Sequence, residues 1–169
     1  MIKDKKIRKT FKEIIKINKK VLQKQKSLCP VCFVINKDYS FGIIMMKFPN
    51  AKSKEHIREW LQKFILSQAG IRGYIIAMDT RLSKIDIKTK EIKVFEALVH
   101  NAYTPKGSIT HTAIYDEDKN FTEEAEVEDI GTSIWNVWNR EEETEQMKDI
   151  EGFYYDFKKK NIEKFKDTF

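Results

Sequence analysis

Residues 91–115 read EIKVFEALVHNAYTPKGSITHTAIY, and this stretch decides the fold. Two runs rich in β-branched and aromatic side chains flank the tetrapeptide TPKG at 104–107, which is typical of a tight turn between antiparallel strands. If Pro and Lys are the two central residues of that turn, the register places His100 directly opposite His111. The stretch therefore predicts a β-hairpin that brings two of the three histidines together.

Further elements are expected on both sides of this hairpin. Residues 30–36 and 41–48 are predicted strands around a turn at 37–40. Ser53 is a candidate N-cap for an amphipathic helix, and Gly70 stands where its C-terminal cap belongs. The remaining expectations are a strand over 74–79, strand-like alternation at Ile85 and Ile87, an exposed acidic loop over 116–129, and a helix that begins at Thr132 or Ser133.

These elements predict one α+β domain with an antiparallel sheet of about five strands, helices packed on one face, and helical arms at both ends. The expected divisions are a basic amphipathic helical arm over 1–26, an α+β core over 27–131 and a C-terminal helical region over 132–169. No apolar run approaches the ~20 residues of a membrane span, and no signal-peptide core follows the N-terminus. Two cysteines are too few for a disulfide scaffold. We therefore expect a cytoplasmic protein without a transmembrane span.

The net charge of +6 conceals a strong segregation of charge along the chain. Residues 1–26 carry eleven basic and two acidic residues, a net charge of +9. Residues 116–151 carry fourteen acidic and three basic residues, a net charge of −11, and the rest of the chain carries +8. A basic arm, a basic body and an acidic segment are therefore the units that bear on possible partners.

The basic arm is predicted to be an amphipathic helix. Its apolar residues fall at helical spacings and leave most of its lysines on the other face. Those lysines are candidate contacts for the phosphate backbone of nucleic acid, although the dominance of Lys over Arg weakens the argument for base readout and for bidentate phosphate recognition. An anionic membrane surface and an acidic protein are alternative partners, and so is packing on the chain's own sheet with a solvated lysine face. The candidate nucleic-acid-binding residues are Lys5, Lys9, Lys12, Lys16, Lys19 and Lys20.

The leading functional hypothesis is a small accessory or binding protein whose basic surface contacts an anionic partner, with nucleic acid first among the candidates. The acidic segment would compete for the same surface and act as an electrostatic gate. Alternatively, it would pair with the basic arm of a second copy and give a homodimer. A protein–protein interaction module is a further possibility. No glycine-rich phosphate loop is present, and six glycines leave little material for one.

The histidine pair and a CxxC sequence suggest metal chemistry. His100 and His111, at a cross-strand distance of about 5 Å between Cβ atoms, have the spacing to share a divalent metal or to act as an acid–base pair. Cys29 and Cys32 would complete a Cys2His2 zinc site, because the chain has no second CxxC. The alternatives are that the cross-strand histidine pair has no function and that the two cysteines are only small apolar side chains at the start of a strand.

A second candidate for metal chemistry combines Asp79, at the end of a predicted strand, with the triplet Glu91-Ile92-Lys93 twelve residues later. The arrangement resembles the Asp…Glu-x-Lys pattern of the PD-(D/E)XK nucleases, although Met78 stands where that family has proline. The resemblance implies that Asp79 and Glu91 bind magnesium and that Lys93 steadies the attacking water. A solvated strand edge is the alternative. A small metal-dependent hydrolase or nuclease is therefore the competing functional hypothesis.

Glu96 interrupts the apolar run over 94–99. A carboxylate in a buried strand is costly unless it is paired, so it either has a basic partner or a shifted pKa that is useful in catalysis. The hairpin register places Tyr115 opposite Glu96, and Arg81 is a candidate partner on the other side. Glu96 is accordingly a candidate catalytic residue, with a structural salt bridge or an exposed face as the alternative.

Overall fold

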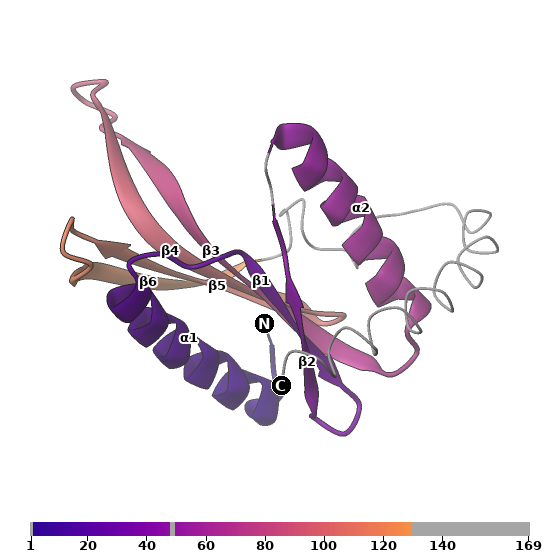
Figure 1. Ribbon diagram of the computed structural model, residues 1–169. Coiled ribbons are helices and arrows are strands. Elements are labelled where there is room, and N and C mark those ends of the chain that lie inside the picture. Colours follow the sequence, from indigo (N-terminus) through magenta and orange to yellow (C-terminus); the bar gives the residue numbers. More distant parts are fainter. Residues whose placement is uncertain (1, 48–49, 130–169) are drawn as a thin grey trace. The chain divides into compact units, whose positions relative to one another are not determined.

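The computed structural model describes residues 2–47 and 50–129 of the chain. The elements follow in the order α1 (Lys5–Gln25), β1 (Val31–Asn36), β2 (Phe41–Met45), α2 (Ala51–Ser67), β3 (Ile71–Ile85), β4 (Ile92–Thr104), β5 (Gly107–Tyr115) and β6 (Phe121–Asp129). All six strands form one antiparallel sheet in the order β2-β1-β3-β4-β5-β6 (Figure 1). The predicted α+β class is confirmed, with six strands among the described residues where about five were expected.

The chain divides into two compact units, one of residues 1–48 with 70–132 and the other of residues 49–69 with 133–169. The first unit holds α1 and the whole sheet, and the described part of the second holds α2. The predicted C-terminal helical region at 132–169 lies outside the described residues. Neither described helix is long and apolar enough to cross a membrane.

Helix α1 forms where the spacing of apolar residues predicts it. The carboxylate of Asp4 caps its N-terminus by accepting from the backbone N–H groups of Lys6 and Ile7, and Lys26 ends it in the left-handed conformation, at a φ of 63°. The buried stripe consists of Ile7, Phe11, Ile14, Ile15, Asn18 and Leu22. This stripe packs on one face of the sheet and makes α1 part of the hydrophobic core (Figure 1).

The predicted hairpin register is confirmed. Strand β4 pairs with β5 so that Thr104 lies opposite Gly107 and His100 lies opposite His111. The predicted strands on either side of the turn at 37–40 are also present, as β1 and β2. The turn residues fixed this register because a tight turn leaves only one way to align the two strands that it joins.

The prediction of an exposed loop over 116–129 is confirmed for residues 116–120, which form a turn, and is wrong for residues 121–129, which form strand β6. Its register with β5 places Glu124, Glu126 and Glu128 on the face that α1 covers. The strand lacks the usual apolar alternation because the side chains on this face are carboxylates, and two of them, Glu124 and Glu128, pair with basic residues of α1. Period-2 alternation is present in β6, but it is an alternation of charge.

Helix α2 begins and ends near the predicted positions, with different caps. Its N-cap is Asn50, whose side-chain oxygen accepts from the backbone N–H of Ser53 at 2.8 Å, so Ser53 lies inside the first turn. The helix ends at Ser67 with Gln68 as its C-cap, two residues before Gly70. The N-cap is the residue whose side chain accepts a hydrogen bond from a backbone N–H of the first turn. Where several short polar residues lie close together, the sequence does not show which of them has this role.

Candidate functional site

Helix α1 separates its basic residues into two groups. The side chain of Lys19 is only 22% exposed and points toward the sheet, together with Arg8. The other five predicted nucleic-acid contacts lie exposed on the outer face and span sixteen residues, which is about 22 Å along a helix that rises 1.5 Å per residue. These five residues are Lys5, Lys9, Lys12, Lys16 and Lys20, and we call them the outer lysines.

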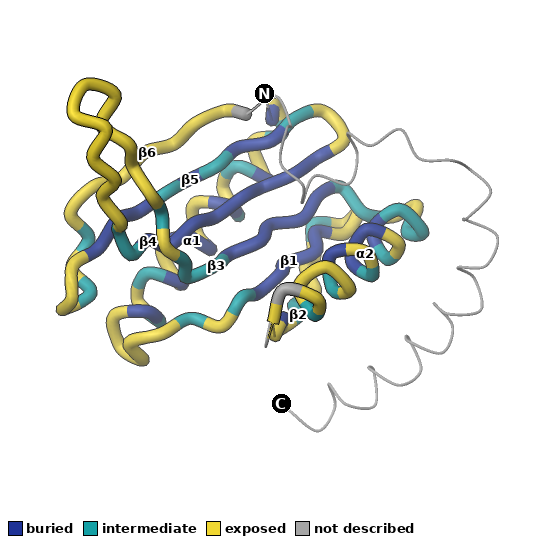
Figure 2. Tube along the Cα trace, turned by 90° about the horizontal axis from the view of Figure 1, so that it is seen from above, coloured by how far each residue is buried: buried dark blue, intermediate teal, exposed yellow. Residues whose placement is uncertain are grey.

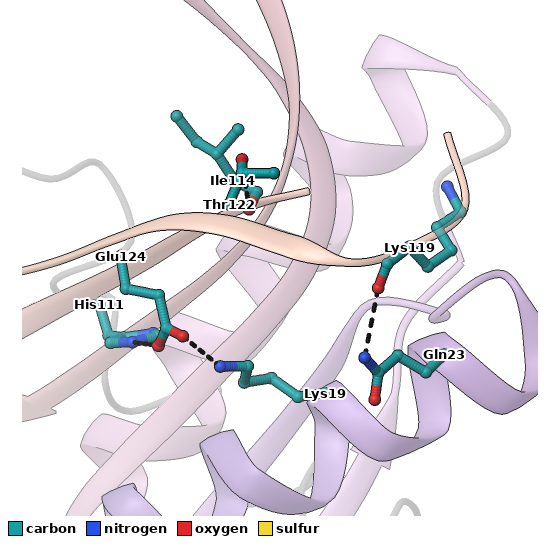
Figure 3. Close-up of polar contacts among 7 residues, drawn as sticks. All are labelled: Lys19, Gln23, His111, Ile114, Lys119, Thr122 and Glu124. Atoms are coloured by element: carbon teal, nitrogen blue, oxygen red, sulfur yellow. Dashed lines mark hydrogen bonds and ion pairs between the residues drawn. The ribbon is translucent and has the colours of Figure 1, made fainter. Parts of the chain in front are cut away.

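The inner basic residues are neutralised by carboxylates of β6. Arg8 forms an ion pair with Glu128, and Lys19 forms one with Glu124. Beyond them, Gln23 donates to the backbone carbonyl of Lys119 at 3.4 Å (Figure 3). Strand β6, in the described part of the acidic segment, therefore contacts α1 of the same chain through the inner basic residues and not through the outer lysines.

The outer lysines have few acidic neighbours among the described residues. Lys9 lies 3.9 Å from Glu13, an exposed i,i+4 pair of the kind that contributes little to stability. The other four have no ion-pair partner in the part of the chain that the structure describes. The outer face of α1 is therefore a strip of uncompensated positive charge on a rigid support.

The histidine pair lies beneath α1. His100 is fully buried and His111 is 8% exposed, and their ring centroids are 5.8 Å apart. Nε2 of His100 lies 3.2 Å from the side-chain nitrogen of Asn18, and Nε2 of His111 lies 3.1 Å from a carboxylate oxygen of Glu124. Figure 3 shows Glu124 between His111 and Lys19. The pair is thus enclosed by α1 above and β6 beside it.

The surroundings of His100 keep its imidazole neutral. Burial is the main cause that lowers its pKa to about 3, and electrostatic interactions with His111 and Lys19 add to the effect. The Nδ1 atoms of His100 and His111 are buried and have no hydrogen-bond partner among the described residues. Glu124 is held ionised, because hydrogen bonding from Lys19 lowers its pKa against the opposing effect of burial.

The structure does not bring the two cysteines to the histidines. Val31 of β1 shares a row across the sheet with Ala77 and His100, so Cys32, the next residue along β1, points to the opposite face. Burial raises the pKa of the Cys32 thiol. No group of three or more His, Cys, Asp or Glu among the described residues is arranged to hold a metal ion. The Cys2His2 site is therefore not assembled within this part of the chain.

The nuclease-like residues are also far apart. Asp79 lies opposite Leu98 and accepts a hydrogen bond from the hydroxyl of Tyr115. Glu91 precedes β4 and is seven residues from Leu98, about 23 Å along a strand that rises ~3.3 Å per residue. Lys93 faces Lys84 across the hairpin. The pattern therefore does not form one carboxylate cluster.

Glu96 has the basic partner that its position requires. Arg81 lies directly opposite it and donates from Nε to Glu96 at 2.8 Å, which raises the pKa of Arg81. The pair lies where the hairpin leaves the covered part of the sheet, so both side chains remain partly or largely exposed. Tyr115, also opposite Glu96, donates instead to Asp79. The contact is a structural ion pair at the edge of the covered region.

Two residues of the buried network were not among the predicted site residues. Asn18 stands within the apolar stripe of α1, four residues after Ile14 and four before Leu22, and a polar residue at such a position signals a buried hydrogen bond. Glu124 could be found only through the register of β6. Its place beside His111 depends on a strand that the apolar pattern does not predict.

The fold and these contacts define an α+β protein in which a lysine-faced helix is fixed to an antiparallel sheet. No known protein family, no curated protein and no solved structure matches the chain.

Proposed function

We propose that this chain is a small cytosolic accessory protein without enzymatic activity, which binds nucleic acid through the outer lysines of α1. The observation that carries the proposal is the sorting of charge on this helix. The inner basic residues are neutralised by β6, while the outer ones form an exposed strip about 22 Å long. The buried stripe of α1 holds that strip in one orientation.

The chemistry of the strip favours phosphate as its ligand. Lysine provides a mobile point charge and lacks the flat bidentate geometry with which arginine recognises guanine or paired phosphate oxygens. Contacts of this kind are made with the nucleic-acid backbone, are independent of base sequence and weaken steeply with salt. The expected binding is therefore electrostatic and tolerant of sequence.

The packing of α1 argues against a membrane surface as the partner. An amphipathic helix that binds lipid buries its apolar face among the acyl chains. In this structure the apolar face of α1 lies against the sheet, with Phe11 only 2% exposed and Leu22 fully buried. Only the charged face is available, and electrostatic attraction alone would have to hold the protein on the lipid.

The test is a titration of the full chain with a labelled oligonucleotide, single-stranded or duplex, over a series of salt concentrations. We expect the logarithm of the affinity to fall linearly with the logarithm of salt. Lys12→Glu/Lys16→Glu removes two central outer lysines, so the slope should become shallower by about two and the affinity should fall for every sequence. Both side chains are exposed, so the fold should be retained.

The matched control is Lys52→Glu/Lys54→Glu, which makes the same change in net charge at two exposed lysines of α2. This variant should bind like the unchanged protein. Equal losses in the two variants would show that net charge, and not the outer face of α1, governs binding. Binding to acidic protein or anionic vesicles without binding to oligonucleotide would reject nucleic acid as the partner. Deletion of 1–26 is unsuitable, because it removes core residues such as Phe11.

A further inference from the structure

The β3–β4 hairpin extends beyond the rest of the sheet. Strand β1 pairs with β3 only as far as Ala77, and β5 pairs with β4 only from Glu96 onward. The hairpin over 81–96, called the ribbon here, therefore continues without a third strand beyond Glu96 (Figure 1), and an ion pair between Lys84 and Glu123 of β6, at 2.8 Å, joins its base to the sheet. Figure 2 shows that it projects from the sheet and is exposed over nearly all its length. Two strands without cover are marginal by themselves, so this projection calls for an explanation.

The ribbon carries four large aliphatic side chains in water. Ile85 and Ile92 face each other across the hairpin and are 62% and 64% exposed, and Val94, two residues further along β4, is 60% exposed. Ile87 in the terminal turn is 82% exposed. Ile85, Ile92 and Val94 lie on one face because residues at every second position of a strand do. Exposed aliphatic side chains gathered on one face in this way are typical of a binding surface.

The tip of the ribbon has a defined shape. A carboxylate oxygen of Asp86 accepts from the backbone N–H groups of Lys88 at 2.8 Å and Thr89 at 3.0 Å, and these bonds lower the pKa of Asp86. Lys90 takes the left-handed conformation, at a φ of 61°, that closes the turn. Ile87 is therefore presented on an ordered turn, which reduces the entropy cost of binding.

Charge differs between the two ends of the ribbon. The outermost four residues, 87–90, carry Lys88 and Lys90, and Asp86 and Glu91 flank them in the same turn. At the base, Tyr115 lies opposite Glu96, so the following turn lies beside the ribbon. That turn contains Asp116, Glu117 and Asp118, and we call it the acidic turn. One molecule thus offers two lysines at the tip, exposed aliphatic side chains on one face of the middle and an acidic turn at the base.

We propose that the ribbon is a dimerisation surface whose partner is the ribbon of a second copy of this chain. The two ribbons would lie antiparallel with their apolar faces in contact, and the tip lysines of each would meet the acidic turn of the other. The contact is isologous, so a single surface must be complementary to itself, and the order basic–apolar–acidic meets that condition only in the antiparallel arrangement. A parallel arrangement would bring four lysines together.

The test is sedimentation velocity of the full chain over a range of concentrations. The unchanged protein should shift from monomer to dimer as its concentration rises. Ile85→Ser/Ile92→Ser should remain monomeric with an unchanged circular dichroism spectrum, because both side chains are already exposed. The matched control is Ile17→Ser/Val127→Ser, which alters two aliphatic residues that are 57% and 60% exposed elsewhere in the described structure. This control should dimerise like the unchanged protein.

A charge exchange tests the antiparallel arrangement. Lys88→Glu/Lys90→Glu should raise the dimer Kd at least about tenfold, since two like-charged contacts replace attractive ones at each end of the interface. Glu117→Lys/Asp118→Lys should have the same effect. The two changes combined should restore most of the affinity, because the tip and the acidic turn are again of opposite charge. Separate losses without restoration would overturn the arrangement.

Other outcomes decide against the dimer. A protein that stays monomeric at every concentration, or a dimer that survives the change at Ile85 and Ile92, would overturn the proposal. If monomeric protein loses oligonucleotide affinity when Ile87 is replaced by Ser, the ribbon is a nucleic-acid contact instead. The dimer does not depend on the proposed role of α1, since Lys12→Glu/Lys16→Glu should leave the sedimentation profile unchanged.

Discussion

The covered and the uncovered parts of the β3–β4 hairpin contain the same two strands and differ completely in burial. Ala77 and His100 face each other beneath α1 and have no exposed surface, whereas Ile85 and Ile92, eight residues further along each strand, are more than 60% exposed. The aliphatic residues of the ribbon are as suited to a strand as those of the core. Strand formation therefore follows from the local sequence, while burial follows from where α1 lies.

The largest effect on the free energy of unfolding should come from the residue through which α1 packs on the buried part of the β3–β4 hairpin. Phe11 is 2% exposed and its ring meets that of His100 edge-on, with centroids 6.5 Å apart. Phe11→Ala should lower the free energy of unfolding by about 3–5 kcal/mol, because it removes buried apolar surface and leaves a cavity. Urea denaturation measures the loss. Ile17→Ala, on the exposed face of the same helix, is the control, and equal losses would contradict the division into two faces.

The buried histidine should make the covered region sensitive to acid. The unfolded chain binds a proton at His100 near the ordinary pKa of 6.5, whereas the folded chain binds it only near 3. The contribution of the neutral imidazole to the free energy of unfolding is therefore fully present above about pH 6.5. Below that pH the free energy of unfolding falls by up to about 1.4 kcal/mol per pH unit. Glu124 adds to this loss only at lower pH. Its pKa is lowered in the folded chain, so its carboxylate takes up a proton in the unfolded chain first, and this favours unfolding.

The measurement is urea denaturation at a series of pH values. His100→Gln should flatten the profile between about pH 4.5 and 6.5, because the titrating group is gone. His56→Gln, at the exposed histidine of α2, is the control and should leave the profile unchanged. An NMR titration in which His100 takes up its proton near 6.5 would contradict the buried, neutral imidazole.

A smaller effect is expected where β3 passes close to β4. A Cβ added at Gly73 would lie 2.7 Å from the backbone oxygen of Tyr103, a contact that only a shift of the strands can relieve. Gly73→Ala should lower the free energy of unfolding by about 1–3 kcal/mol. Gly42→Ala is the control, since nothing lies within 4 Å of a Cβ at that position. Thermal unfolding of both variants measures the difference, and an equal response would argue against the close approach.

The smallest effect on stability should come from the ribbon. Ile92→Ser changes a residue that is 64% exposed, so the free energy of unfolding of the monomer should change by no more than about 0.5 kcal/mol. Denaturation of dilute protein, where dimers dissociate, is the measurement. A loss as large as that of Phe11→Ala would show that the ribbon is covered within the monomer, and the distinction between the two parts of the hairpin would fail.

The sequence predicted the hairpin register because the turn at 104–107 and the strand-forming residues around it are local signals. It placed His100 opposite His111 for the same reason. Helix α1 was predicted from its apolar spacing. Strand β6 was missed because its inward residues are glutamates and not apolar residues. These glutamates face the basic residues of α1, a helix about a hundred residues earlier in the chain, as the contact between Lys19 and Glu124 shows. Apolar periodicity cannot register such a contact.

The predicted zinc and magnesium sites were not assembled for a similar reason. Cys32 and His100 are compatible with a zinc site by residue type, and so are Asp79 and Glu91 with a magnesium site. Whether they meet depends on which face and which rung each occupies, and one position along a strand reverses the face. Residue type alone therefore overestimates the number of metal-binding sets.

By itself, the sequence determined the α+β class, the segregation of charge, the amphipathic character of α1 and the central register of the sheet, because each depends on neighbours within a few residues or on one tight turn. Only the tertiary structure decided which lysines are free, which histidine is neutral and which aliphatic residues remain in water. Those properties depend on what covers a residue, and the helix and strand that provide the cover come from opposite ends of the described chain.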